Sequence, residues 1–199
     1  MLAELMALAL QVSEGDISSG YSQLEDCAAA EGPAPVNERC PGYGGWSVYV
    51  GASEHSAGLA YSGRARAEQF AQRPITDGVS QSFARTIEWR VRWSGGAWTP
   101  FATIHRWYSV TSHEGAPASK DRPAVDIGTE LLVVSVLRED GPIGACHAAY
   151  LDVQEVYQVN DVARRFAADQ MADGFRCGID APYQIGAGEA ALLMERGRL

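Results

Sequence analysis

The stretch TIEWRVRW, residues 86–93, decides the fold. Apolar and charged residues alternate along it, with Ile87, Trp89, Val91 and Trp93 in one set and Glu88, Arg90 and Arg92 in the other. A period of two is typical of a β-strand that has one buried face. A glycine-containing turn follows at residues 94–97, and residues 98–110 then read as a returning strand. We therefore predict a β-hairpin at the centre of the fold.

Placing Trp93 opposite Trp98 sets the predicted register of this hairpin. Apolar side chains then meet apolar side chains along one face, which supports the pairing. On the other face, His105 becomes a diagonal neighbour of Glu88, and Arg90 lies beside them. This register therefore predicts a polar cluster on one face of the sheet.

Further apolar segments extend the predicted sheet. They cover residues 46–50, 57–62, 130–138 and 145–153. A helix is predicted after them, because Asn160 suits an N-cap and apolar residues recur every three or four positions from Val162 to Phe175. We predict an α+β fold in which an antiparallel sheet of about five or six strands packs against this C-terminal helix.

Glycine and proline are frequent in an early part of the chain. GPAP occupies residues 32–35, and PGYGG follows at residues 41–45. This composition is typical of turns, so residues 13–45 are predicted to form an irregular, disulfide-stapled N-terminal arm. We place a single α+β domain at residues 13–177 and a C-terminal tail at residues 178–199.

Four cysteines stand in two pairs that are close in sequence, Cys27 with Cys40 and Cys146 with Cys177. Four cysteines allow three connectivities, and we favour these two pairs because each closes a local loop. Each bridge would stabilise the fold by roughly 2–4 kcal/mol. The alternative is four buried thiols in a reducing compartment.

The composition excludes several classes of protein. Of the 199 residues, 46% are hydrophobic and 21% are charged, which fits one globular domain and excludes disordered and collagen-like chains. Lys and Arg total 16 against 25 Asp and Glu, which gives a formal net charge of −9. General nucleic-acid and anionic-membrane binders need a cationic surface, so the charge argues against both classes, and we expect no nucleic-acid partner and no membrane span.

The N-terminal residues predict export. Residues 5–10 form the longest apolar run, which is far shorter than the roughly 20 residues of a membrane span. The run includes an A-x-A-like site of the kind that ends a signal peptide, so we interpret residues 1–12 as a signal-peptide remnant. A basic n-region is missing and Glu4 precedes the run, so the alternative is a frayed apolar end. Together with the paired cysteines, this predicts a periplasmic or secreted protein.

Five segments between residues 21 and 177 form a recognisable set. They are Cys40-Pro41-Gly42-Tyr43, Glu88-Trp89-Arg90, Pro100-Phe101-Ala102-Thr103-Ile104-x-Arg106, Cys146-His147-x-Ala149-Tyr150-x-Asp152 and Asn160-x-x-Ala163-Arg164-x-x-Ala167-x-Asp169. The set resembles a family of small exported bacterial proteins of unknown function. The resemblance implies export and disulfide bonds. The chain departs from the family pattern at both ends. Because the family has no assigned activity, the resemblance implies no chemistry.

Glu88, His105 and Arg90 form the candidate catalytic group. A carboxylate can orient an imidazole as a general base, and an arginine can bind a carboxylate or phosphate of a substrate. These three residues would make the protein a small periplasmic hydrolase, which is the alternative function. The simpler interpretation is a cross-strand ladder of ion pairs.

The candidate binding residues are Arg90, Thr103, Trp107 and His113. Trp107 shares a strand face with Thr103 and could line an aromatic groove. His113 lies in the polar stretch 111–129, and a loop of this length is uncommon unless it is functional. We therefore predict a binding loop at residues 111–129.

No metal or cofactor is expected. A zinc site made of His105, His113 and His147 would require the predicted loop to fold back over the sheet. Cys146 next to His147 is a possible nucleophile pair, but adjacent strand residues point to opposite faces of a sheet. Sequence motifs of serine hydrolases, dinucleotide-binding proteins and P-loop proteins do not occur.

These observations favour binding over catalysis. Catalytic signatures are missing, disulfides are predicted, and a long polar loop is available for recognition. We expect a non-catalytic binding or inhibitor-like protein of the bacterial envelope, with an unidentified protein or small molecule as its partner.

Overall fold

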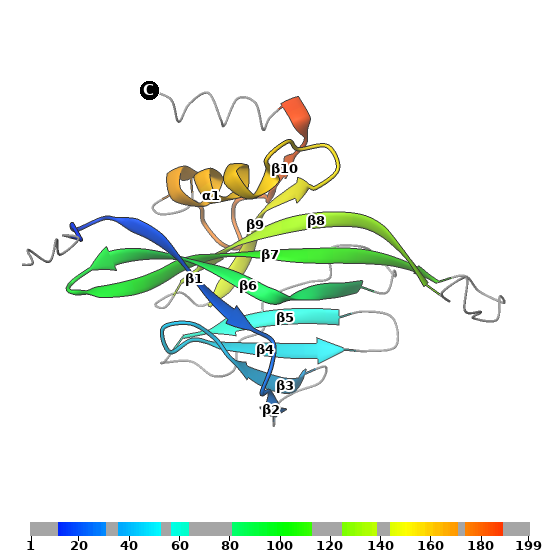
Figure 1. Ribbon diagram of the computed structural model, residues 1–199, viewed down its shortest axis with the longest axis horizontal. Helices are drawn as coiled ribbons and strands as arrows, with labels where there is room; N and C mark the ends of the chain where they lie inside the picture. The colour runs from blue at the N-terminus through cyan, green and yellow to red at the C-terminus, as the bar shows by residue number, and fades with distance from the viewer. Residues whose placement is uncertain are drawn as a thin grey trace, which may run out of the picture.

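The computed structural model describes residues 12–30, 36–52, 57–63, 81–112, 125–138, 144–170 and 174–188. Two sheets and one helix form three layers, with the larger sheet in the middle (Figure 1). In spatial order, the larger sheet contains β1 (Ile17–Gln23), β6 (Gln81–Ser94), β7 (Ala97–Ser112), β8 (Val125–Leu137), β9 (Ala145–Asp152) and β10 (Tyr183–Ile185). The smaller sheet contains β2 (Ala28–Ala29), β3 (Val36–Pro41), β4 (Ser47–Ala52) and β5 (Ala57–Ser62), and the helix is α1 (Val159–Gln170). The predicted α+β class, mostly sheet with one helix, is confirmed.

The edge strand β10 makes the larger sheet mixed rather than antiparallel. It pairs in parallel with β9, placing Tyr183 beside Ala149 and Ile185 beside Leu151. Two parallel strands need a crossover connection, and α1 lies between β9 and β10 in the chain. The prediction of an antiparallel sheet is therefore wrong at this edge, and part of the predicted tail at residues 178–199 belongs to the sheet.

Strands replace much of the irregular arm that was predicted for residues 13–45. β1 pairs with β6 at the edge of the larger sheet, whereas β2 and β3 belong to the smaller sheet. β1 is polar, so its extended form depends on the partner strand more than on its own sequence. Gly20 is needed in β1, because a Cβ there would lie 2.4 Å from a ring atom of Tyr43. The disulfide between Cys27 and Cys40 therefore lies in the smaller sheet and does not staple a separate arm.

The β6–β7 hairpin keeps the predicted register only near its turn. Val91 pairs with Pro100, as predicted. An irregularity between Arg90 and Val91 then shifts the pairing by one residue, and Glu88 lies opposite Ile104. Because side chains alternate between the two faces, a shift of one residue changes which side chains share a face.

Pro100 gives a physical reason for the position of this shift. Proline has no N–H to donate to the strand ladder, so within sheets it occurs at edges and irregularities. Beyond the shift, His105 lies opposite Ile87, in the buried face away from Glu88. The predicted proximity of Glu88 and His105 is wrong for this reason.

The larger sheet buries a separate core on each face. On the helix side, strands β7 to β9 pack against α1 through residues that include Ile104, Val134 and Phe166. The other face packs against the smaller sheet, and we call the layer between the two sheets the intersheet core. This layer is rich in aromatic residues, and the ring of its fully buried Trp89 lies 5.6 Å from that of Tyr61, edge to face.

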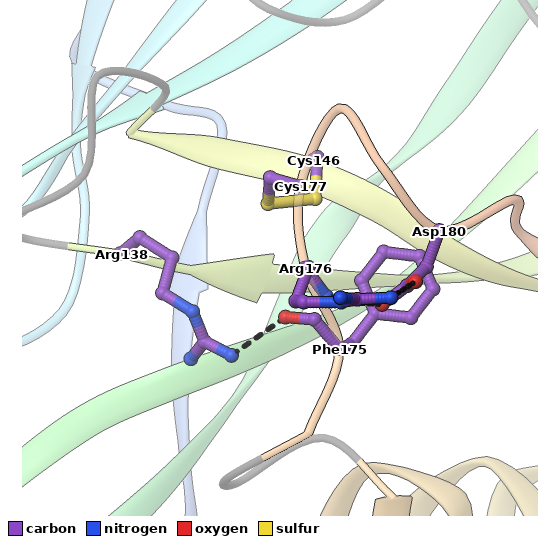
Figure 2. Close-up of a disulfide and its surroundings, with 6 residues drawn as sticks. All are labelled: Arg138, Cys146, Phe175, Arg176, Cys177 and Asp180. Carbon is purple, nitrogen blue, oxygen red and sulfur yellow. Dashed lines mark hydrogen bonds and ion pairs between the residues drawn. A yellow bond between two sulfur atoms is a disulfide. The ribbon is translucent and has the colours of Figure 1, made fainter.

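All four cysteines are bonded, in the two pairs favoured above, Cys27–Cys40 and Cys146–Cys177. Figure 2 shows the second bond, which joins β9 to the segment that follows α1. Beside it, Nη2 of Arg138 donates a hydrogen bond of 3.0 Å to the carbonyl oxygen of Phe175. The segment after the helix is therefore held to the larger sheet by a covalent bond and by a charged hydrogen bond.

Candidate functional site

Glu88 is the centre of an ionic cluster on the helix side of the larger sheet. This residue of β6 is only 8% exposed. Arg164 of α1 donates two hydrogen bonds to it, from Nε to Oε1 at 2.8 Å and from Nη2 to Oε2 at 3.0 Å. The hydroxyl of Ser19 in β1 donates another to Oε1 at 2.6 Å. The cluster therefore ties the helix and the edge strand to β6.

Arg90 completes this ionic cluster. Its Nη1 lies 3.5 Å from Oε1 of Glu88, and it also donates a hydrogen bond to the hydroxyl of Ser19. Burial alone would raise the pKa of Glu88, but hydrogen bonds from Arg164 and Ser19 and the charges of both arginines lower it below its usual value. A carboxylate that is stabilised and occupied in this way is a poor general base.

His105 lies in the intersheet core and is 1% exposed. Its Nε2 lies 2.7 Å from the carbonyl oxygen of Ala84, in a part of β6 where the pairing with β7 is irregular. A carbonyl only accepts hydrogen bonds, so Nε2 carries the proton and Nδ1 keeps a lone pair. Burial lowers the pKa of His105 to about 4, and the imidazole is therefore neutral at pH 7.

Aromatic rings and a second histidine lie next to His105. The ring centroid of Trp107 is 6.2 Å from that of His105 and 5.7 Å from that of His147. Nδ1 of His147 lies 3.0 Å from the hydroxyl of Tyr150. Burial lowers the pKa of His147 to about 4, with a smaller contribution from His105. Both imidazoles are therefore packed as neutral rings.

Two buried polar atoms in this layer have no hydrogen-bond partner among the described residues, Oγ1 of Thr103 and Nδ1 of His105. Thr103 is fully buried, and its hydroxyl interacts with Tyr61 without reaching hydrogen-bond geometry. Burial raises the pKa of Tyr61 well above its usual value. An unpaired buried polar group costs about 1–3 kcal/mol, so this part of the intersheet core is less stable than an apolar one.

The residues predicted for binding do not share one surface. Arg90 belongs to the ionic cluster on the helix side, whereas Thr103 and Trp107 lie in the intersheet core. His113, with most of the predicted loop, lies outside the described residues, as do residues 1–11 of the predicted signal-peptide remnant. The proposed pair of Glu88 and His105 is split between the two faces of the sheet.

The residues around Cys146 have structural roles. Cys146 is held in a disulfide, and His147 contacts Trp107 and Tyr150. Oδ1 of Asp152 accepts hydrogen bonds from the backbone N–H groups of two residues in the turn after β9, at 2.8 and 3.3 Å. None of these groups is positioned as a nucleophile with its base.

Arg164 and Ser19 were not predicted as part of a site. Their contacts with Glu88 join residues that are 76 and 69 positions apart in the chain. The sequence did contain one indication that a cation of the helix pairs with Glu88. A carboxylate on a strand face that packs against a helix needs a cation to compensate the cost of its burial. The helix carries adjacent arginines at 164 and 165, and its sequence alone does not show which of them reaches the strand.

We compared the chain with protein families, curated proteins and solved structures, and none of the three comparisons found a match.

Proposed function

We propose that this chain is an exported, non-catalytic binding protein of the bacterial envelope, and that it recognises a protein partner through the far end of the β7–β8 hairpin. Two disulfides are consistent with an oxidising compartment. Among the described residues, no helix is long and apolar enough to cross a membrane. The carboxylate of Glu88 is occupied by Arg164, Ser19 and Arg90, although Nε of Arg90 has no hydrogen-bond partner among the described residues. An occupied carboxylate favours a structural role for the cluster over catalysis.

The length of the β7–β8 hairpin carries the proposal. β7 and β8 have 16 and 13 residues, whereas β9 has 8. β6 pairs with β7 no further than Ser109, and β9 pairs with β8 only between Leu131 and Leu137. Among the described residues, the hairpin continues beyond these points as two strands, with Ser112 opposite Val125 at the end of the paired part.

This two-stranded extension runs past the neighbouring strands (Figure 1). An isolated pair of strands buries little hydrophobic core of its own. Strand ends and loops on a rigid scaffold are common sites of recognition. A projecting ribbon suits a protein partner, because a small molecule usually binds in a concave site. The hydrolase alternative has less support, since its acid and its base lie on opposite faces of a sheet.

Site-specific photo-crosslinking in the bacterium that makes the protein tests this proposal. A photoreactive amino acid replaces Thr111 at the far end of the hairpin, and the control replaces Thr99 near the β6–β7 turn. We expect a covalent partner adduct from position 111 and none from position 99, in the envelope fraction and with both disulfides intact by mass spectrometry. Equal labelling at both positions would refute the hairpin as the binding element, and a cytoplasmic protein with four free thiols would refute export.

A further inference from the structure

Three potential metal ligands meet at one end of the smaller sheet. Cys27 stands just before β2, and Glu38 and Cys40 belong to β3. Ala28 pairs with Arg39 and Ala29 with Glu38, so the two strands lie directly side by side. The sulfur atoms of both cysteines and a carboxylate oxygen of Glu38 all lie within 4.8 Å of one another.

We propose that reduction of the Cys27–Cys40 disulfide creates a Zn²⁺ site, in which the two thiolates and the carboxylate of Glu38 bind the ion. Thiolate and carboxylate are both zinc ligands, and a tetrahedral ion with three protein ligands keeps one position for water. In the oxidised protein the sulfur atoms are bonded to each other and cannot act as thiolates. The site is therefore open only in the reduced protein, and the inference does not depend on the proposed function.

Reduction needs an external two-electron reductant, and the step balances when the reductant is a dithiol. A thiolate of the dithiol attacks one sulfur of Cys27–Cys40, which breaks the protein disulfide and forms a mixed disulfide. The second thiol of the reductant then displaces the protein sulfur. Two electrons pass to the cysteines, the reductant leaves as a disulfide, and zinc binding releases the thiol protons to water.

The strands hold two of the three ligands in place without help from the disulfide. β3 pairs with β4 through Glu38, Arg39, Cys40 and Pro41, so two of the three ligands stay fixed when the bond opens. Cys27 lies next to the two-residue strand β2, whose alanines are exposed, and the residue is only partly buried, whereas Cys40 is fully buried. A reductant can therefore approach the bond from the Cys27 side, and opening it frees only a short edge segment.

The second disulfide differs in its surroundings. Cys146 and Cys177 pack against the helix-side core and hold the segment after α1 to β9. Among the described residues, the only group of three potential ligands within reach of one another is the one at Cys27, Glu38 and Cys40. The Cys146–Cys177 pair is therefore an internal control for the proposed site.

The charges around the site favour a cation. Glu25 and Asp26 directly precede Cys27 in the chain. Oε1 of Glu25 lies 3.9 Å from Nη1 of Arg85, so Asp26 and Glu38 are the acidic residues that add to the negative charge here. The nearest cationic residue in β3, Arg39, donates from Nε and Nη2 to the hydroxyl of Ser47 at 2.9 and 2.8 Å. Successive strand residues point to opposite faces, so the guanidinium of Arg39 is directed away from the face that carries Glu38 and Cys40.

Native mass spectrometry of the full chain with added Zn²⁺, before and after reduction by a phosphine that does not bind zinc, tests the proposal. We expect one zinc ion per reduced chain and none on the oxidised chain. In the double variant Cys27→Ser/Cys40→Ser, reduction still exposes Cys146 and Cys177, and we expect no zinc. Zinc retained equally by this variant, or none on the reduced wild type, would overturn the proposal.

A second variant tests the carboxylate without touching the cysteines. Glu38→Gln preserves size and removes one ligand, and Glu155→Gln is the control at an exposed turn position. In competition with a chromophoric chelator, we expect Glu38→Gln to weaken zinc binding at least about tenfold and Glu155→Gln to leave it unchanged. Far-UV circular dichroism shows whether each reduced variant is folded. Equal affinity in Glu38→Gln and wild type would refute the three-ligand site.

Discussion

The two faces of the larger sheet bury polar groups in opposite ways. On the helix side, Glu88 is ionised and its oxygens are bonded by Arg164, Ser19 and Arg90. On the intersheet side, His105 and His147 are buried as neutral rings. A charge is tolerated where a helix supplies a counter-ion, and neutral groups are required where only sheets and aromatic rings are near.

The largest expected difference between the two faces is in their response to acid. The pKa of both histidines is about 4 in the folded protein, against an ordinary value near 6.5. Folding therefore favours the neutral form of both histidines. Their contribution to the unfolding free energy is fully present above pH 6.5 and is lost as the pH falls toward 4. The two groups together give a slope of up to about 2.7 kcal/mol per pH unit in the unfolding free energy.

Urea unfolding between pH 7 and pH 5 measures this slope. Glu88 does not contribute in that window, because its pKa lies below 4.5, and its stabilisation is lost only at lower pH. In the variant His105→Gln/His147→Gln neither group titrates, and we expect most of the slope to disappear. An unchanged slope in that variant would show that the two histidines do not control the acid response.

A smaller effect is expected from removing the charge of Glu88. Glu88→Gln removes the carboxylate that faces Arg90 and Arg164 in a half-buried site, and Arg164 keeps its contact with Asp161 at 3.4 Å. Breaking a fully buried pair costs about 3–5 kcal/mol, and Arg164 is 37% exposed, so we expect a loss of about 2–3 kcal/mol. Chemical denaturation at pH 7 checks this value.

The pair of Arg176 and Asp180 is the control for this substitution. Its Nη2–Oδ1 distance is 2.8 Å, as short as the contact of Arg164 with Glu88, but its side chains are 66% and 28% exposed, whereas that of Glu88 is 10% exposed. We expect Asp180→Asn to change the stability far less than Glu88→Gln. Similar losses from both variants would mean that burial does not set the strength of the ionic cluster.

The smallest effect is expected at Thr103 and has the opposite sign. Thr103→Val replaces a hydroxyl that has no hydrogen-bond partner among the described residues with a methyl group of similar size. Removing an unpaired buried polar group stabilises a protein, and we expect a gain of about 1 kcal/mol in the unfolding free energy. Thr99→Val, on the same strand at an exposed position, is the control and should change little. A loss of stability in Thr103→Val would indicate that this hydroxyl is hydrogen-bonded in solution.

The sequence supported some of these features better than others. The β6–β7 hairpin was predictable because Trp89 and Val91 alternate with charged residues, and α1 because its apolar residues recur at helical spacing. β1 was missed, since a polar strand such as Ile17–Gln23 has no pattern of its own and gains its structure from β6. The smaller sheet was missed as a layer, because its strands β4 and β5 read equally well as members of one sheet.

The candidate site was less predictable than the fold. Glu88 and Arg90 were singled out, and they lie together in the structure. His105 was predicted to lie on the same sheet face as Glu88 and Arg90. The one-residue shift of the β6–β7 pairing next to Pro100 places it on the opposite face. The contacts of Glu88 with Arg164 and Ser19 could not be read from spacing, because they join segments that are far apart in the chain.

The sequence by itself determined the local features of this protein: the central hairpin, the helix, the class of fold and the two pairs of cysteines close in sequence. Only the tertiary structure decided the register beyond Pro100, the parallel strand β10, the second sheet and the partner of Glu88. The physical reason is the range of the interactions. Periodicity and turn chemistry act between neighbours in the chain, whereas strand pairing and burial depend on segments that meet only in the folded protein.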